Sequence, residues 1–167
     1  MTGPELHLVS VTEADTRAIG AAVAGLLVPG DVVGLTGDLG AGKTRLVQGA
    51  ASALGVEGPV ISPTFMLVRE YDGDVDVHHV DAYRLDGPAE LEDLGLDNVL
   101  DPDTIVFVEW ADRVERVLPE NWLEIRLEVE DDDRRRVALR SHGSAWRPRM
   151  AVLRVSLNPF LAPPQVI

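Results

Sequence analysis

The sequence predicts an α/β fold in which a mixed sheet with parallel central strands carries antiparallel hairpins and has helices on both faces. Two continuous apolar runs, residues 31–36 and 104–108, have the composition of strands that are buried on both faces, as central parallel strands are. The first run leads through a glycine-rich loop into an amphipathic segment at residues 43–54. This order of strand, loop and helix is the element around which the chain is organised.

The other elements follow from local patterns. A short strand is expected at residues 5–11, and Thr12 with Asp15 resembles a capping box that leads into a helix over residues 17–27. Alternating polarity around polar turns predicts two antiparallel hairpins, the second at an edge of the sheet. Their strands are residues 65–71 and 75–81 for the first, and residues 122–129 and 134–139 for the second. Short helices are expected within residues 86–100, and a further helix at residues 146–154.

Length and composition indicate one domain. The chain has 167 residues, of which 46% are hydrophobic, so one substantial core is expected over residues 1–155. Residues 156–167 form a proline-containing tail with no periodicity, and no structure is assigned to it. The absence of cysteine excludes disulfides, thiolate metal sites and a cysteine nucleophile. With neither a leader pattern nor an apolar run of membrane-spanning length, a cytoplasmic protein that does not contact membranes is expected.

The net charge of −13 disfavours unaided binding to nucleic acid, because phosphate backbones are held mainly by lysine and arginine. If the protein acts on nucleic acid, a partner is expected to hold that nucleic acid.

The glycine-rich loop fits the pattern G-x-x-x-x-G-K-[ST], which is typical of a phosphate-binding loop. Fourteen of the fifteen basic residues are arginines, so Lys43 is the only lysine in the chain. A compact ammonium suits a cradle of phosphate oxygens where a planar guanidinium would not fit. The residues of the pattern, all expected to bind the phosphates, are Gly37, Asp38, Leu39, Gly40, Ala41, Gly42, Lys43 and Thr44.

Carboxylates follow two of the expected strands. Asp81 ends one strand and Glu109 ends another, and in an open α/β sheet ligands gather outside the carboxyl ends of the strands. Together with the Thr44 hydroxyl, these carboxylates are expected to complete a Mg²⁺ site. Asp81 is also compatible with a turn or capping residue, and Glu109 with an ion pair.

Three further groups of polar residues are less specific. His78 and His79 point to opposite faces of one strand, so packing or surface roles are expected for both and neither is assigned to catalysis. The triplet at residues 134–136 is expected to be a charge run of an edge strand rather than an anion clamp. Ser62 and Thr64, on either side of Pro63, fit equally a switch segment that senses a γ-phosphate or an ordinary turn.

Several motifs occur in a fixed order over residues 12–127. They are GDLGAGKT at 37–44, SPTF followed by LV and a tyrosine at 62–71, H-x-D-x-Y-R-L at 79–85, E-L-x-x-L-G-L at 90–96 and V-E-W at 108–110. In this series the chain resembles the TsaE family of small bacterial ATPases, which are needed to make threonylcarbamoyladenosine in tRNA. The resemblance implies a three-layer P-loop NTPase fold, binding of ATP and Mg²⁺, and action with the TsaB and TsaD proteins, so that tRNA is met only through their complex.

The resemblance also implies roles for individual residues. Lys43, Asp81 and Glu109 are the expected catalytic residues, and Thr44, Asp81 and Glu109 the expected metal ligands. Besides the loop, the nucleotide is expected to contact Arg45, the switch residue Thr64, Trp110, and Thr12 and Glu13 near the start of the chain. Residues 111–113 match the family only loosely, and the tail past residue 155 has no counterpart in it.

Three other functions compete with this reading. A GTPase would need an N-K-x-D motif for guanine, which a chain whose only lysine is Lys43 does not contain. A small-molecule kinase could use residues 112–113 and the arginine triplet, but no lid segment is recognisable. A binding module that uses ATP only as a switch, without significant hydrolysis, would have the same motifs.

Overall fold

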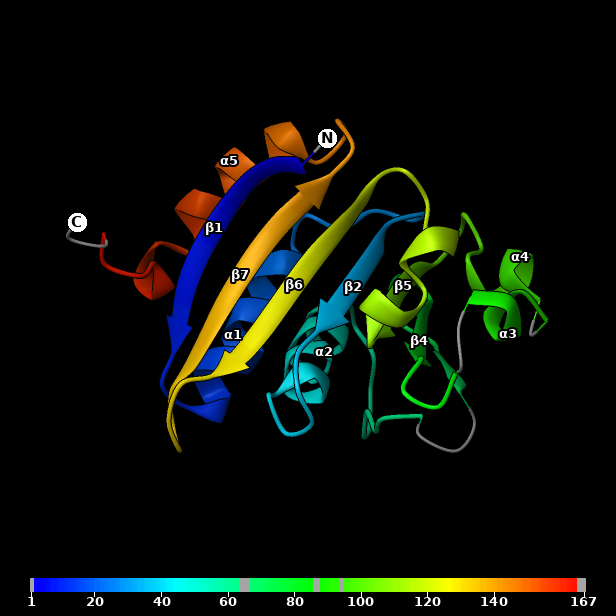
Figure 1. Ribbon diagram of the computed structural model, residues 1–167, viewed down its shortest axis with the longest axis horizontal. Helices are drawn as coiled ribbons and strands as arrows, with labels where there is room; N and C mark the ends of the chain where they lie inside the picture. The colour runs from blue at the N-terminus through cyan, green and yellow to red at the C-terminus, as the bar shows by residue number, and fades with distance from the viewer. Residues whose placement is uncertain (1, 64–66, 86–87, 94, 165–167) are drawn as a thin grey trace.

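A mixed sheet runs through the whole molecule (Figure 1). The structure is a computed structural model that describes residues 2–63, 67–85, 88–93 and 95–164. Within these residues the sheet has seven strands in the order β1-β7-β6-β2-β5-β4-β3. The central strands β6, β2, β5 and β4 are parallel, whereas β1 with β7, β7 with β6 and β3 with β4 are antiparallel. The strands are β1 (Thr2–Ser10), β2 (Val32–Thr36), β3 (Val68–Tyr71), β4 (Val77–Asp81), β5 (Ile105–Glu109), β6 (Trp122–Val129) and β7 (Arg135–His142).

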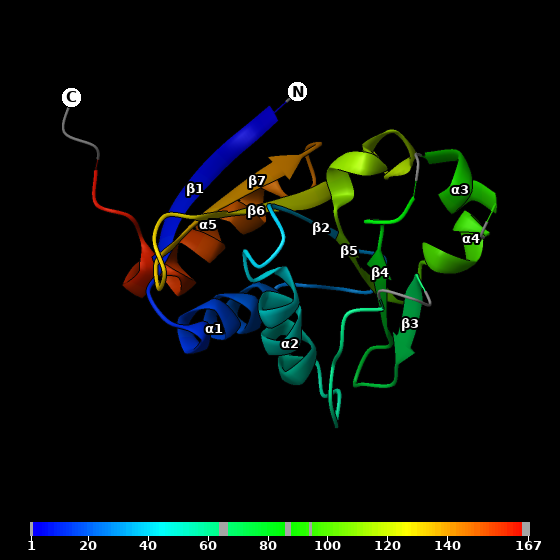
Figure 2. The same ribbon diagram turned by 60° about the horizontal axis from the view of Figure 1, so that its bottom comes forward.

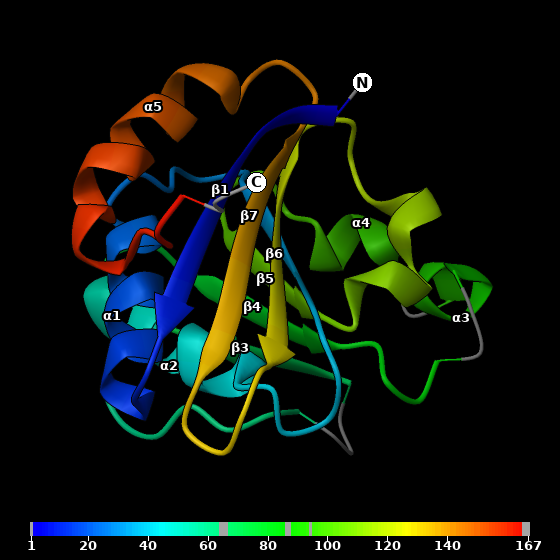
Figure 3. The same cartoon turned by 60° about the vertical axis from the view of Figure 1, so that its left-hand side comes forward.

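Helices cover both faces of the sheet, which gives three layers (Figure 3). One face carries α1 (Glu13–Ala24), α2 (Lys43–Ala53) and α5 (Arg147–Ser156) over the larger apolar cluster. The other face carries α3 (Pro88–Asp93), α4 (Leu96–Val99) and the 3₁₀ turns η1 (Ala111–Arg113) and η2 (Glu115–Val117) near a smaller cluster. The predicted α/β class, with parallel central strands and antiparallel hairpins, is confirmed.

The start of α1 shows why this helix begins where it does. The Thr12 side chain accepts a hydrogen bond from the Asp15 amide, and the Asp15 carboxylate accepts one from the Val11 amide. These bonds satisfy backbone donors that the first turn leaves unpaired. The capping pair is therefore as the sequence indicates, but the helix starts at Glu13 and ends at Ala24, earlier at both ends than the predicted residues 17–27.

Helices α1 and α2 lie side by side (Figure 2), and glycine allows their backbones to touch. A Cβ added at Gly49 would overlap the backbone carbonyl of Arg17, and one added at Gly20 would overlap that of Leu46. Backbone atoms cannot move aside as the end of a flexible side chain can. The close approach of the two helices therefore depends on these two glycines.

We expect Gly49→Ala to lower the free energy of unfolding by about 1–3 kcal/mol, the usual cost of forcing an extra carbon into a packed interface. This corresponds to roughly 2–4 °C in melting temperature per kcal/mol for a chain of this size. The control is Gly25→Ala, whose added carbon lies at an ordinary 3.4 Å from Ala22 O. Thermal unfolding that is equal for the two variants would contradict the backbone contact.

The position predicted for the second hairpin is wrong. Strand β7 is covered by β1 along residues 2–10, and β6 pairs with the central strand β2, so the hairpin lies inside the sheet. The edge is β1 instead. The first strand of the chain thus pairs with the last, a long-range contact that local alternation of polarity does not reveal.

Part of the predicted tail is ordered against the domain. Helix α5 continues to Ser156, the turn η3 (Asn158–Phe160) follows, and Leu161 forms a β-bridge with Leu8. The Ala162 amide donates a hydrogen bond to the carbonyl of His7. The tail therefore covers part of the free edge of β1.

In the described part of the chain, no helix has the length and apolar character needed to cross a membrane.

Candidate functional site

A cleft of about 650 Å³ opens at the carboxyl ends of the parallel strands. Strands β2, β4, β5 and β6 run in the same direction, so the segments that follow them meet at one edge of the sheet. Most residues predicted from the sequence for the site line this cleft: Thr12, Glu13, Leu39, Gly40, Ala41, Gly42, Lys43, Thr44, Arg45, Asp81, Glu109 and Trp110. Thr64 lies outside the described residues, and Gly37 and Asp38 contact Lys43 rather than the cleft.

Residues 37–42, here called the glycine loop, need glycine at two positions in particular. Gly37 has φ of 138°, and a Cβ on it would overlap the carbonyl of Leu127 in β6. Gly42 has φ of 107° and is the N-cap of α2. Left-handed backbone of this kind is readily adopted only by glycine. The loop therefore turns sharply out of β2 and presents the first turn of α2 to the cleft.

Lys43 is folded back onto the glycine loop. Its Nζ donates hydrogen bonds to the carbonyls of Gly37 at 2.6 Å and Asp38 at 2.9 Å, and it lies 4.1 Å from the centre of the Trp110 ring. The side chain is only 5% exposed. Burial lowers the pKa of Lys43 from its ordinary value, while the charges of nearby carboxylates, Glu109 first, act in the opposite direction. The buried ammonium is thus held by neutral carbonyl oxygens and an aromatic face.

Asp81 and Glu109 are directly opposite each other in the parallel pair β4 and β5, on the face of the sheet that α2 covers. Glu109 is 3% exposed, and its Oε1 accepts a hydrogen bond from the Thr44 hydroxyl at 2.8 Å. Asp81 accepts one from the Ser62 hydroxyl at 2.8 Å and another from the Tyr83 amide at 2.9 Å. Asp81 therefore fixes the turn after β4 as well as facing the cleft, so both interpretations of this residue from the sequence have a structural basis.

His79 is buried, as a packing role requires, and it also contacts Glu109. The two histidines do point to opposite faces of β4, and His78 Nδ1 contacts the carbonyl of Val99 on the far side. His79, however, is 0% exposed, and its Nε2 lies 2.8 Å from Glu109 Oε1. One oxygen of Glu109 is thus shared by Thr44 from the cleft side and by His79 from within the sheet.

Trp110 has an unusual backbone that places its ring over the lysine. With φ of 60° and ψ of 41° it is in the left-handed region, which is uncommon for a residue other than glycine. Its ring packs against Tyr83, with the ring centres 4.9 Å apart, and the Arg113 guanidinium lies 5.7 Å from the Trp110 ring centre. The chain therefore leaves β5 in a sharp turn that covers the glycine loop with aromatic surface.

The tip of the second hairpin forms another wall of the cleft. Asp132, Asp133 and Arg135 line it because β6 is parallel to β2 and ends at the same edge. Arg135 Nη1 donates hydrogen bonds to the carbonyls of Asp131 at 3.0 Å and Asp132 at 3.1 Å, so the guanidinium orders the tip. The sequence predicts no role in the site for this tip, because it predicts the hairpin only as an edge of the sheet.

Other lining residues could be found from the sequence only in part. Gln48 is one turn after Thr44 on α2, a spacing that puts both on one face, and it links to the segment before Ser62 through the Val60 carbonyl. Tyr83 belongs to the same short motif as Asp81. The remaining ones are Thr16, one turn after Thr12 in α1, and Ile61, which directly precedes Ser62.

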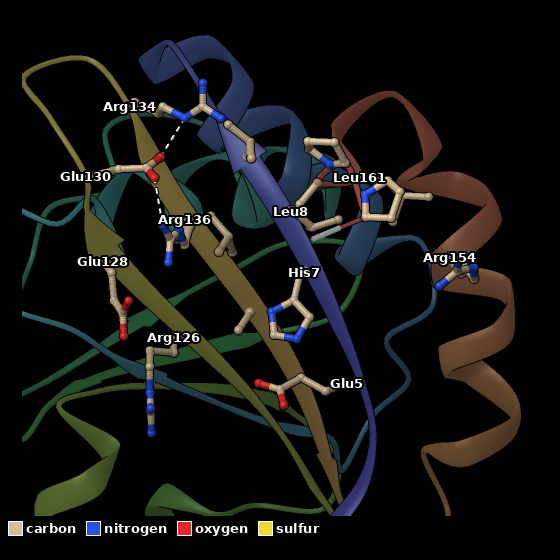
Figure 4. A pocket seen from close by; sticks show the side chains of 16 residues that line it. Glu5, His7, Leu8, Arg126, Glu128, Glu130, Arg134, Arg136, Arg154 and Leu161 are labelled. Carbon is tan, nitrogen blue, oxygen red and sulfur yellow. Dashed lines mark hydrogen bonds and ion pairs between the residues drawn. The ribbon is translucent and has the colours of Figure 1, made fainter. Parts of the chain in front are cut away.

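A second hollow, of about 1020 Å³, lies along the outer side of β1, β7 and β6 and beside the tail (Figure 4). Two arginines that line the hollow form ion pairs with Glu130. Arg134 Nε lies 2.6 Å from Glu130 Oε2, and Arg136 Nη2 lies 2.7 Å from Glu130 Oε1. Hydrogen bonds from Arg136 and Arg134 lower the pKa of Glu130. Each of these two arginines is thus paired with the single Glu130 carboxylate, as in a charge run, although their strand is not at the edge of the sheet.

Comparison with known proteins shows which family the chain belongs to. The family model described as "Threonylcarbamoyl adenosine biosynthesis protein TsaE" matches residues 10–137. The chain belongs to the TsaE family. TsaE proteins take part in tRNA threonylcarbamoyladenosine biosynthesis, and the matched segment contains the glycine loop, both carboxylates and the hairpin tip.

Individual TsaE proteins match over most of their length. The TsaE of Bacillus subtilis is 40% identical over 143 residues, which are 85% of this chain and 89% of that protein. The TsaE of Streptomyces coelicolor is 44% identical over an alignment of 139 positions, which covers 78% of this chain and 93% of that protein. The crystal structure of YdiB from Bacillus subtilis superimposes with a TM-score of 0.76 at 34% identity, covering 95% of this chain and 97% of that one.

Proposed function

We propose that this TsaE chain binds and hydrolyses ATP with Mg²⁺, and that hydrolysis supports repeated turnover by a TsaB–TsaD complex that modifies tRNA. The observation that carries the proposal is the cleft itself. It brings Lys43, Thr44 and the carboxylates of Asp81 and Glu109 together at the end of the glycine loop. A phosphate cradle and a pair of metal-binding groups at neighbouring strand ends are the parts that phosphoryl transfer requires.

The proposed binding of the nucleotide phosphates is supported by α2 and Lys43. The first turn of α2 directs unpaired backbone amides toward the cleft, where they favour an anion. The lysine ammonium now donates to Gly37 and Asp38 carbonyls. Phosphate oxygens carry more charge than these carbonyls, so we infer that the ammonium moves from the loop to the β- and γ-phosphates when nucleotide binds.

The proposed binding of Mg²⁺ is supported by the kinds of oxygen ligands that the cleft contains. Asp81 and Glu109 would repel a triphosphate, and a divalent cation between them and the phosphates removes that repulsion. In the described residues no group of three or more His, Asp or Glu could hold a metal. Mg²⁺ needs no such group, since one or two carboxylates with a hydroxyl and phosphates are its usual ligands in nucleotide sites. Thr44 and Glu109, already joined at 2.8 Å, fit this role, with Asp81 beside them.

Hydrolysis is assigned to the carboxylates. Bound Mg²⁺ would neutralise the charge that develops on the transferred phosphoryl group. Glu109 or Asp81 would orient the attacking water, because both are buried at the floor of the cleft next to the glycine loop. Ser62, whose hydroxyl contacts Asp81, connects this carboxylate to the segment before Thr64 that we propose as the switch.

Both the net charge and the family membership support the proposed partners. With a net charge of −13, the chain is poorly suited to binding tRNA. We therefore propose that TsaB and TsaD bind the tRNA and that this protein reaches tRNA only through them. The test is a threonylcarbamoyl-transfer assay with purified TsaB, TsaD and tRNA. We expect many product molecules per TsaD only when this protein and Mg²⁺-ATP are both added. Equal product with and without this protein would refute the proposed role.

We expect ATP to be preferred to GTP, since the chain has no lysine for a guanine-binding N-K-x-D motif. Calorimetric titration of the isolated protein with each nucleotide in Mg²⁺ measures the preference. Tight GTP binding without ATP binding would favour a GTPase, and phosphate transfer to a nucleoside or sugar would favour a kinase. ATP binding that supports turnover without hydrolysis would favour an ATP-switched binding module.

A further inference from the structure

Glu109 receives two hydrogen-bond donors on the same oxygen. The Thr44 hydroxyl and His79 Nε2 are each 2.8 Å from Oε1. Thr44 is in the first turn of α2 at the floor of the cleft, whereas His79 is on β4 and fully buried. The two donors therefore attach the carboxylate to two different parts of the fold, one that faces the ligand and one that belongs to the core.

The position of His79 follows from strand geometry. Side chains alternate along a strand, so His79 and Asp81 share the face of β4 that α2 covers. The register pairs Asp81 with Glu109 and His79 with Phe107. A side chain two residues before Asp81 thus reaches across to the neighbouring strand end, and its hydrogen bond links the strand of Asp81 to the Glu109 carboxylate in addition to the backbone pairing of β4 and β5.

The ring nitrogens indicate how His79 acts. An ionised carboxylate only accepts hydrogen bonds, so Nε2 carries the hydrogen that it shares with Glu109. Nδ1 is buried and has no partner among the described residues. Nε2 is thus the ring nitrogen through which His79 bonds to another side chain, and it donates to Glu109.

We propose that His79 is a positioning residue that holds Glu109 in one orientation toward the cleft. Its Nε2–H fixes Oε1 relative to β4, and with it the distance between the Glu109 and Asp81 carboxylates. The inference rests on the proposed function, since it concerns how the hydrolytic carboxylate is held. His79 is not among the residues that line the cleft, so we infer that it acts only through Glu109.

The first test compares turnover by His79→Leu and His79→Gln. We expect His79→Leu to lower kcat for ATP about 10–100-fold, the usual cost of losing a group that orients a metal ligand, with KM for ATP unchanged because the glycine loop is intact. The amide nitrogen of His79→Gln can replace Nε2, so this variant is expected to recover most of kcat. Equal loss in both variants would refute positioning by a donor.

The matched control is His78→Leu. It makes the same change at the next residue of the same buried strand, but on the opposite face, where His78 contacts Val99. Thermal unfolding of the three variants measures any general loss of packing. We expect kcat to fall only in His79→Leu; an equal fall in His78→Leu would show that packing in β4, and not the contact to Glu109, is responsible.

The last measurement needs no activity. Long-range ¹H–¹⁵N spectra of the nucleotide-free protein report which ring nitrogen of His79 carries hydrogen, and we expect hydrogen on Nε2. Hydrogen on Nδ1 alone would overturn the proposed contact. The outcomes are distinguishable: a wild-type protein that does not hydrolyse Mg²⁺-ATP refutes the proposed function, whereas active wild type with an equally active His79→Leu refutes only the role of His79.

Discussion

Replacing Lys43 by alanine is expected to abolish repeated turnover in the threonylcarbamoyl-transfer assay and to lower ATP hydrolysis about 10²–10³-fold. Lys43 is the only lysine of the chain, and its ammonium is buried at the end of the glycine loop. No other lysine can supply the point charge. We expect the affinity for ATP to fall as well, because the ammonium already contacts phosphates in the bound ground state, although more weakly than in the transition state.

Two comparisons make this result specific. Arg116→Ala removes one positive charge from an exposed site on η2 and is expected to leave hydrolysis unchanged. Lys43→Arg keeps the charge but places a planar fork where a compact ammonium lies, so it is expected to remain impaired. Multiple turnovers by Lys43→Ala equal to those of wild type would refute the phosphate-binding role of the glycine loop.

Glu109→Gln is expected to separate binding from hydrolysis. The amide oxygen can still accept the hydrogen bonds from Thr44 and His79, so the fold of the site is retained while the negative charge is lost. We expect kcat to fall about 10²–10³-fold. ATP binding is expected to persist but to depend less on Mg²⁺, which calorimetric titrations with and without the metal will measure.

The matched control for this variant is Glu115→Gln, an exposed carboxylate on η2. It makes the same chemical change and is expected to alter neither kcat nor the dependence on Mg²⁺. If Glu109→Gln hydrolyses ATP at the wild-type rate, the role of this carboxylate in orienting metal and water is wrong, and Asp81 becomes the remaining candidate.

The sequence predicts those parts of the site that are continuous in the chain. The loop at residues 37–44, its strand and its helix follow one another, so local patterns suffice for them. Asp81 and Glu109 could be predicted because each directly follows a buried strand. Their direct opposition depends on two further facts that the structure supplies, namely that the strands are parallel neighbours and that their register pairs Asp81 with Glu109.

The parts that could not be predicted depend on which strands are neighbours. Placing Arg135 beside the glycine loop requires β6 to pair with β2, and this pairing is set by packing of the whole sheet. The contact between His79 and Glu109 depends on the register of β4 against β5. The alternation of side chains along one strand does not determine that register. Alternation correctly separates His78 from His79, but it does not show which of the two faces the cleft.

The sheet order has a consequence for how the site is made during synthesis. Strand β2 leads into the glycine loop, yet its two neighbours are Ile105–Glu109 and Trp122–Val129, which emerge from the ribosome much later. Contacts between distant parts of a chain form slowly, because the long loop between them must close first. The glycine loop of a growing chain is therefore synthesised well before β5 and β6, whose ends complete the cleft. Nucleotide cannot guide the early stages of folding, and the site is completed together with the last strands of the sheet.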